Sequence, residues 1–285
     1  MMVDVQDSQS ENKEEGQIQV IQMITNMFSK IGSNDLASLK EYLDSGDSDI
    51  KEYTNAVEYT YNVSPQIYST DTENIRQVHP DKSFQSLGLG SSSSGNSMMS
   101  TMMSTDVFYE MPSDESLYVD QYDVKAGRWP KAYNECVLVL TQNGKINDLM
   151  SYTLGLRDFS ELDDMVDKFS QEEEVNAPEN TDTYSYEDVL GKEFKLVNAA
   201  DYYEYDEEYD LYRDKTDNQS YMKKLIENGE TIKIVGIVQP AKGTTAIMLQ
   251  TGIGYPQSLT THVIEQAQAS EIVKKQLENK DIDVF

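Results

Sequence analysis

The chain has 285 residues, enough for one large domain or for two smaller ones that each bury a core. It carries 51 acidic against 23 basic residues, and this formal net charge of −28 is spread along the whole sequence. Such a charge repels phosphate backbones and anionic lipid headgroups, which argues against nucleic-acid binding. Cationic peptides or metal ions are the partners that it would attract. Nineteen tyrosines and seven phenylalanines supply large side chains for a core.

Cysteine content and hydropathy say little about the compartment. The single cysteine, Cys136, lies in the apolar run 136–140 and is expected to be a small buried hydrophobe. The first residues have neither a basic nor an apolar region, so no signal peptide is expected. No run approaches the roughly 18 apolar residues that a membrane helix needs. If the natural protein is membrane-bound, this chain is a soluble part of it.

Two amphipathic helices are predicted near the N-terminus. The first covers residues 18–31, where apolar residues recur at steps of three and four before Gly32. The second is expected to begin at Ser33 or Asn34 as N-cap and to end near Gly46. Its apolar face would consist of Leu36, Leu39, Tyr42 and Leu43.

The pattern changes to a period of two after Ala56. Apolar side chains alternate over residues 57–63 and resume at Ile67-Tyr68 after Pro65, which predicts a strand with residues 74–79 as its hairpin partner. Residues 88–104 are rich in serine and methionine without usable periodicity and are expected to form a flexible linker.

Further elements follow in the second half. Strands are predicted over residues 107–111, 136–140, 193–197 and 232–238. Asn143-Gly144 predicts a turn before a helical stretch at 145–154, and Ser160 with Asp163 suggests a capping box for the next helix. The prediction also includes an acidic linker at 172–183 and a short helix at 221–226. It ends with a turn at Gly252-Ile-Gly254 and Tyr255-Pro256 and one final long helix over 259–273.

Motifs of catalysis are missing from the sequence. His79 and His262 stand far apart and cysteine is scarce, so a zinc site is not expected. The serine run in 88–104 lacks the Gly-x-Ser-x-Gly spacing of a nucleophile elbow, and no complete nucleotide-binding glycine motif occurs. We therefore expect a protein that is not an enzyme and has no cofactor.

The stretch 201–212 has the most distinctive chemistry, because six carboxylates are interleaved with five tyrosines. It could contact a cation or a basic peptide. Alternatively it is a strand or hairpin whose tyrosines pack inward while its acids face water, and the alternation of Tyr203 and Tyr205 favours this view. The candidate contact residues are Asp201, Glu204, Asp206, Glu207, Glu208 and Asp210.

An ordered series of motifs resembles the extracytoplasmic domain of ABC-transporter permeases of the MacB/FtsX type. A Gly127-Arg-Trp-Pro130 turn precedes the strand at 135–140. Leu190-Gly-Lys-Glu-Phe-Lys-Leu196 and Ile234-Val-Gly-Ile-Val238 resemble two later strands of that family. Gly252-Ile-Gly-Tyr-Pro256 is similar to its return segment toward the second membrane helix. Residues 140–190 are longer than in the family, and 201–228 looks like an insertion.

The resemblance implies an α+β fold with two lobes on the extracellular face of the cell membrane. A porter-like α/β lobe would comprise residues 1–115 and 241–285, and a mainly β, Sabre-like lobe would comprise residues 116–240. The implied role is non-catalytic: ATP hydrolysis by a separate domain or subunit inside the cell would move the outer lobes. Peptide or antibiotic efflux, lipoprotein release and control of cell-wall hydrolases are the implied processes.

The implied partners are the protein's own transmembrane helices, an ABC ATPase, a second permease subunit, and a peptide or cell-envelope protein. An alternative function is a secreted or surface protein that captures cationic peptides on the acidic tyrosine stretch. A hydrolase would need a carboxylate pair in a cleft, for which the sequence gives no signal.

Overall fold

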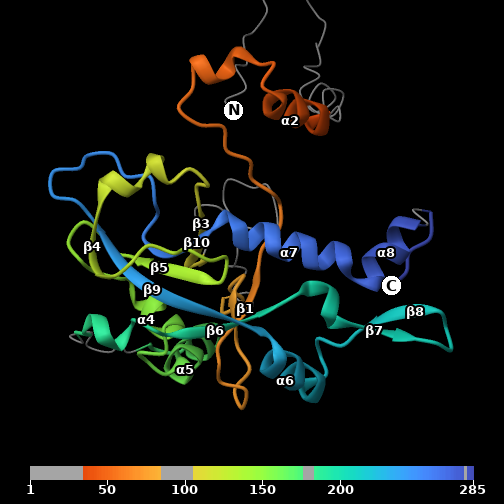
Figure 1. Cartoon of the computed structure of the whole chain (residues 1–285). Coiled ribbons are helices and arrows are strands. Elements are labelled where there is room, and N and C mark those ends of the chain that lie inside the picture. The colour runs from red at the N-terminus through yellow and green to blue at the C-terminus, as the bar shows by residue number, and fades with distance from the viewer. Residues whose placement is uncertain (1–34, 85–104, 176–182, 279–280) are drawn as a thin grey trace, which may run out of the picture. The chain divides into compact units, whose positions relative to one another are not determined.

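The computed structural model describes residues 35–84, 105–175, 183–278 and 281–285, and Figure 1 draws their helices and strands. The chain divides into two compact units, Met1–Asn55 and Ala56–Phe285. Within the described part of the smaller unit lie the helix α2 (Leu36–Ser45) and the 3₁₀ helix η1 (Asp49–Glu52). The predictions at 18–31 and 88–104 fall outside the described residues, as does part of the linker at 172–183.

Helix α2 confirms the second predicted helix. Its N-cap is Asp35, not Ser33 or Asn34 as predicted, and the Asp35 carboxylate accepts a hydrogen bond from the Ser38 backbone N–H at 3.0 Å. The helix ends at Gly46, whose φ of 84° is the left-handed conformation that glycine adopts at little cost. Its apolar face, which includes Leu36 and Tyr42, is exposed.

The larger unit is built around one mixed sheet with the strand order β2-β1-β6-β9-β5-β10-β3, in which β4 also pairs with β9. Strand β9 is parallel to β5 and antiparallel to β6 and β4, while β10 is antiparallel to β5 and parallel to β3. The strand bounds are β1 (Gln66–Tyr68), β2 (Gln77–His79), β3 (Phe108–Met111), β4 (Tyr122–Gly127), β5 (Glu135–Val139), β6 (Glu193–Val197), β9 (Glu230–Pro240) and β10 (Gly252–Pro256).

Helices and a separate hairpin complete this unit, and the mixture of one large sheet with several helices confirms an α+β fold. The hairpin consists of β7 (Tyr203–Asp206) and β8 (Leu211–Asp214). The α-helices are α4 (Asp148–Thr153), α5 (Phe159–Ser170), α6 (Gln219–Asn228), α7 (Gln257–Ala269) and α8 (Glu271–Glu278). The 3₁₀ helices are η4 (Glu115–Leu117), η5 (Val119–Gln121), η6 (Tyr186–Asp188) and η7 (Ala199–Tyr202).

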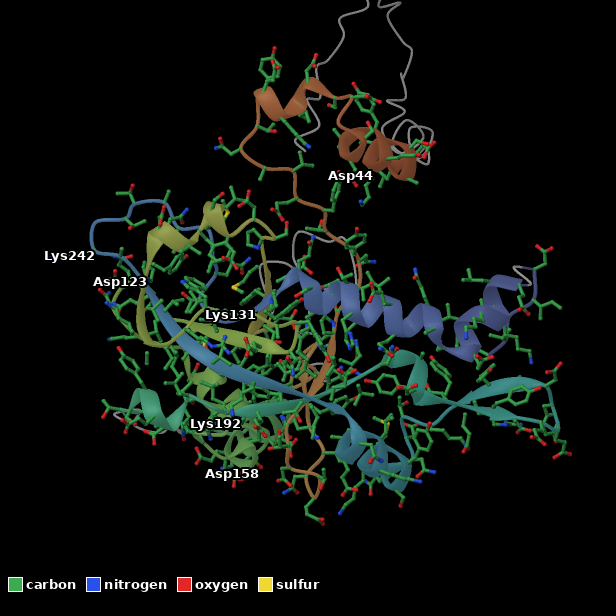
Figure 2. All side chains as sticks on the ribbon, in the orientation of Figure 1. Asp44, Asp123, Lys131, Asp158, Lys192 and Lys242 are labelled. Atoms are coloured by element: carbon green, nitrogen blue, oxygen red, sulfur yellow. The ribbon has the colours of Figure 1, made fainter. Side chains whose placement is uncertain are left out.

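Strand β5 is buried on both faces of the sheet. Cys136 and Leu138 belong to a core cluster that also contains side chains of α4 and α7. Val137 and Val139 belong to a second cluster with the aromatic residues around η5. Alternate residues of a strand point to opposite faces, so this division explains why the run is apolar throughout. Charged side chains such as Asp123, Asp158 and Lys242 are exposed on the surface (Figure 2).

Glycines allow β4 and β9 to approach closely. A Cβ on Gly236 would lie 2.0 Å from the carbonyl oxygen of Arg128, and one on Gly127 would lie 2.1 Å from the carbonyl oxygen of Val235. Gly127 also has a φ of 66°, which side chains disfavour. The Arg128 N–H donates to the Val235 carbonyl at 3.0 Å. Both positions therefore require glycine.

Several predicted elements are confirmed. Strands lie at or within one or two residues of the predicted ranges 107–111, 136–140, 193–197 and 232–238. Strand β2 pairs antiparallel with β1, as expected of a hairpin, and residues 142–144 form the predicted turn, with Gly144 at a φ of 71°. A helix covers residues 148–153 of the predicted stretch 145–154, and α6 includes the whole predicted stretch 221–226.

Other predictions are wrong in instructive ways. Residues 57–63 form no regular strand, because they have no ladder partner and the pairing with β6 begins at Gln66. The Gly252–Gly254 segment is not a turn but part of strand β10 between β5 and β3. A Cβ at Gly252 would meet the Val107 carbonyl oxygen at 2.5 Å, so the glycines serve close strand packing.

Two helix boundaries also differ from the prediction. The N-cap of α5 is Asp158, which accepts from the Ser160 N–H at 2.9 Å, so Ser160 lies inside the helix. The final helix is two helices, because Ser270 adopts an extended backbone after α7. The Ser270 hydroxyl then accepts from the Val273 N–H at 3.4 Å at the start of α8.

Candidate functional site

The acidic tyrosine stretch forms a hairpin. Strands β7 and β8 pair antiparallel, with Tyr205 opposite Tyr212, and the turn between them includes Asp210 at a φ of 53°. The hairpin is held to the C-terminal residues, since the Tyr212 N–H donates to the Val284 carbonyl at 2.8 Å. The tyrosines do not all pack inward: Tyr205 and Tyr209 are exposed.

Three of the six candidate carboxylates are neutralised by the protein's own cations. Glu204 pairs with Lys215 at 2.8 Å, and Asp206 accepts from Arg213 Nε at 2.5 Å. The third, Asp210, forms an ion pair with Lys275. The Lys275 ammonium also lies over the Tyr205 ring, 4.5 Å from the ring centroid. The hydrogen bond from Lys275, and to a smaller extent the one from Tyr205, lowers the Asp210 pKa. These ion pairs fasten β7 to β8 and to α8.

The remaining three carboxylates are differently placed. Glu207 and Glu208 lie exposed in the hairpin turn, with no side-chain ion pair to a described residue. Asp201 lies outside the hairpin, on η7, and lines a cavity. The structure therefore does not gather the six carboxylates into one site.

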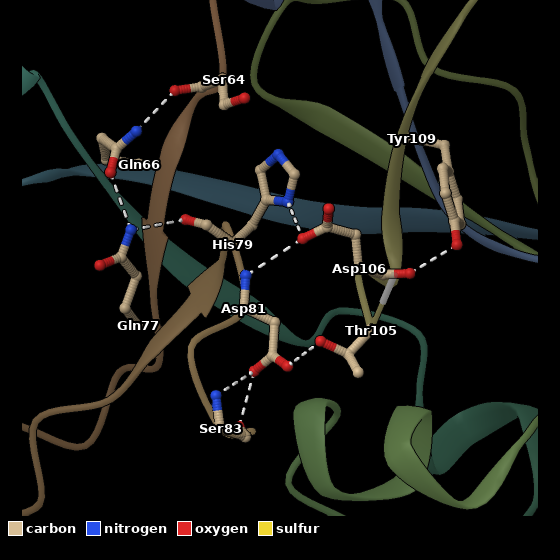
Figure 3. Close-up of polar contacts among 9 residues, drawn as sticks. All are labelled: Ser64, Gln66, Gln77, His79, Asp81, Ser83, Thr105, Asp106 and Tyr109. Carbon is tan, nitrogen blue, oxygen red and sulfur yellow. Dashed lines mark hydrogen bonds and ion pairs between the residues drawn. The ribbon is translucent and has the colours of Figure 1, made fainter. Parts of the chain in front are cut away.

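A buried polar cluster surrounds His79 at the end of β2 (Figure 3). His79, Asp81 and Asp106 are only 5%, 6% and 8% exposed. His79 Nδ1 lies 3.5 Å from Asp106 Oδ1, which accepts from the Asp81 N–H at 3.1 Å. Asp81 in turn accepts from the Thr105 hydroxyl at 2.5 Å and from the Ser83 hydroxyl at 2.6 Å.

This cluster ties residues 79–83 to residues 105–106, and its acceptors are largely occupied by neighbouring donors. The Asp106 carbonyl also accepts from the Tyr109 hydroxyl at 2.5 Å, and the His79 ring lies 5.7 Å from that of Phe108. Asp81 and Asp106 were not predicted from the sequence, because no local pattern relates two acids that the fold brings together across 25 positions.

The second histidine, His262, is part of a surface cluster that joins α7 to the start of β9. Its Nε2 lies 2.9 and 3.1 Å from the two Glu230 oxygens, and its ring stacks on Tyr133 with centroids 4.0 Å apart. The Tyr133 hydroxyl donates to Glu230 at 2.6 Å. Burial raises the Glu230 pKa, but the hydrogen bonds from Tyr133 and His262 outweigh it and the net shift is downward.

A bidentate ion pair connects the Gly127–Pro130 turn to the start of β5. Arg128 donates to Glu135 at 2.7 and 2.5 Å, and the Lys131 N–H donates to the same carboxylate at 2.7 Å. Chiefly because of the Arg128 hydrogen bond, the Glu135 pKa falls to about 2. The next residue, Cys136, is fully buried, and burial raises the pKa of its thiol.

Comparisons with protein-family models, curated proteins and solved structures found no match to this chain. In the described ranges, no group of three His, Cys, Asp or Glu side chains is arranged to hold a metal ion. No helix in those ranges combines the length and apolar character needed to cross a membrane.

Proposed function

We propose that this chain is the extracytoplasmic domain of an ABC-transporter permease of the MacB/FtsX type. In this role it is not an enzyme: a separate domain or subunit hydrolyses ATP inside the cell, and the domain moves with the membrane helices to act outside the membrane. Peptide or antibiotic efflux, lipoprotein release and control of cell-wall hydrolases are the processes that such a domain would serve.

One observation carries the proposal: the segments that resemble the family lie side by side. Strands β6, β9, β5 and β10 are consecutive neighbours in the sheet. The segments that form them lie far apart in the sequence, between residues 135 and 256. The Gly127–Pro130 turn is joined to β5 by the ion pair between Arg128 and Glu135, and its backbone packs against Gly236 of β9. An ordered series of motifs thus corresponds to one structural unit, as a shared architecture requires.

The finer division into a porter-like lobe and a Sabre-like lobe remains a prediction. Strands β3 and β10 belong to the predicted porter-like ranges, and β5, β6 and β9 to the predicted inserted range 116–240. All five are part of one sheet. A continuous sheet suits a mechanical role, because its strands move together when one of them is displaced.

The gene that encodes the full protein tests this proposal. We expect hydrophobic segments long enough to span a membrane on both sides of residues 1–285, and an ABC ATPase in the same protein or in an adjacent gene. A full-length protein without flanking hydrophobic segments would overturn the proposal.

The alternative, a free protein that captures cationic peptides, draws on Glu207 and Glu208, the turn carboxylates that have no ion pair to a described residue. Titrating a basic peptide into the wild-type chain and into a variant with Asp206, Glu207 and Glu208 neutralised separates the two functions. Binding that disappears in the variant favours capture, and binding that is absent or unchanged favours the mechanical domain.

A further inference from the structure

A cavity of about 420 Å³ lies beside η7, between the end of β6, helix α6, the start of β9 and helix α7. Its volume falls within the range of about 300–1,000 Å³ that is usual for small-ligand pockets. Leu196, Val197 and Val263 line it with apolar side chains that are themselves at most 6% exposed. The cavity therefore has a well-packed apolar floor.

Asp201 brings an unneutralised carboxylate to this cavity. Its side chain has no hydrogen bond or ion pair with any described residue, and its backbone carbonyl accepts from the Tyr221 hydroxyl at 2.9 Å. Burial raises the Asp201 pKa, and no charged neighbour contributes to the shift. The nearby Lys215 is engaged with Glu204 at 2.8 Å. The Asp201 side chain is exposed at the cavity, so an incoming cation can reach its carboxylate, which attracts it.

Glu230 contributes a second negative charge to the lining. Its two oxygens face His262 and the Tyr133 hydroxyl, which fix the side chain, and these hydrogen bonds keep its pKa below the ordinary value despite burial. The cavity thus combines an apolar floor with one free and one fixed carboxylate, and no Lys or Arg side chain is among its lining residues.

We propose that this cavity binds an ammonium group carried on a short aliphatic chain, with the ammonium at Asp201 and the methylene groups on the Leu196, Val197 and Val263 floor. A lysine side chain of a peptide and a free alkylamine share this chemistry. The negative charge of Glu230 strengthens the attraction for the cation. The inference does not depend on the proposed transporter role, because it is argued from the lining of the cavity alone.

The test is a nuclear magnetic resonance titration of the full chain with three probes: hexylammonium, hexanol, and an acetylated and amidated Gly-Lys-Gly peptide. Hexanol matches the hexylammonium chain without its charge. The variants are Asp201→Asn and, as a matched control, Glu208→Gln, which removes the same charge from the exposed hairpin turn. Unchanged amide spectra without probe establish that each variant is folded.

We expect hexylammonium, the peptide or both to shift the amide signals of residues 196–201 and 225–230 in the wild type and in Glu208→Gln. Asp201→Asn should weaken this binding about tenfold or more, a loss of about 1.4 kcal/mol. Binding of the peptide alone identifies a peptide lysine as the ligand, and binding of hexylammonium alone identifies a free amine.

Three results would overturn the inference. Neither cationic probe binds; Asp201→Asn and Glu208→Gln bind equally well; or hexanol binds as tightly as hexylammonium. Shifts confined to the hairpin residues 203–214 would have the same meaning, since they would assign the attraction to exposed acids.

Discussion

Replacing Gly236 by alanine should destabilise the larger unit strongly. Gly236 is buried in β9, and its new Cβ would lie 2.0 Å from the carbonyl oxygen and 2.8 Å from the carbonyl carbon of Arg128. Real Cβ atoms do not approach other atoms so closely, and a backbone neighbour cannot rotate away as a side chain can. The segment after β4 must therefore move away from β9.

The size of the effect follows from two contributions. Overpacking a buried site costs about 1–3 kcal/mol, and a backbone clash belongs at the upper end of that range. Separation also weakens the hydrogen bond from the Arg128 N–H to the Val235 carbonyl, which is worth about 1 kcal/mol. We expect Gly236→Ala to lower the free energy of unfolding by about 3–4 kcal/mol.

Urea denaturation followed by circular dichroism measures this loss. The matched control is Gly243→Ala, because Gly243 has a φ of 90° but no atom within 4 Å of its added Cβ. The control should lose about 1–2 kcal/mol from backbone strain alone. If Gly236→Ala lowers the free energy of unfolding no more than Gly243→Ala does, the close packing of the segment after β4 on β9 does not stabilise the larger unit as proposed.

Two further predictions concern a buried acid and an ion-paired acid. Asp106→Ala should cost about 3 kcal/mol of unfolding free energy, because it leaves the buried Asp81 N–H without its acceptor and removes the carboxylate that lies 3.5 Å from the buried His79 ring. Asp123→Ala, which removes an exposed pair with Lys125, should cost less than about 0.5 kcal/mol in the same denaturation assay. Equal losses in the two variants would contradict the first prediction. Because folding lowers the Glu135 pKa from 4.5 to about 2, the ionised carboxylate stabilises the folded state. This contribution is fully present above pH 4.5 and is lost as the pH falls toward about 2. Glu135→Gln should flatten the acid limb of stability plotted against pH, and an unchanged acid limb would show that Glu135 makes no such contribution.

Local patterns predicted the central strands well. Strand β5 was predictable because an unbroken apolar run suits a strand that is covered on both faces, as Cys136 to Val139 are. The helix α2 was predictable from its period and from Gly46, although the choice of Asp35 as N-cap depends on which of several adjacent polar residues meets the Ser38 N–H.

Tertiary contacts decided the elements that the sequence did not predict. The alternation at 57–63 has the strand period, yet no neighbouring strand extends to pair with it. The glycines at 252 and 254 suggest a turn by composition, but they lie where β10 passes close to Val107 and Met111. The pairing of His79 with Asp106 arises from the fold, and no spacing in the sequence announces it.

The location of the domain is the central claim, and labelling of intact cells tests it most directly. Lys242→Cys places a thiol on an exposed loop, whereas the native Cys136 is fully buried and should stay unreactive in the folded protein. The full-length variant, in its own cells, should react with a membrane-impermeant maleimide before the cells are opened. Labelling that appears only after the cells are permeabilised would contradict the proposed extracytoplasmic position.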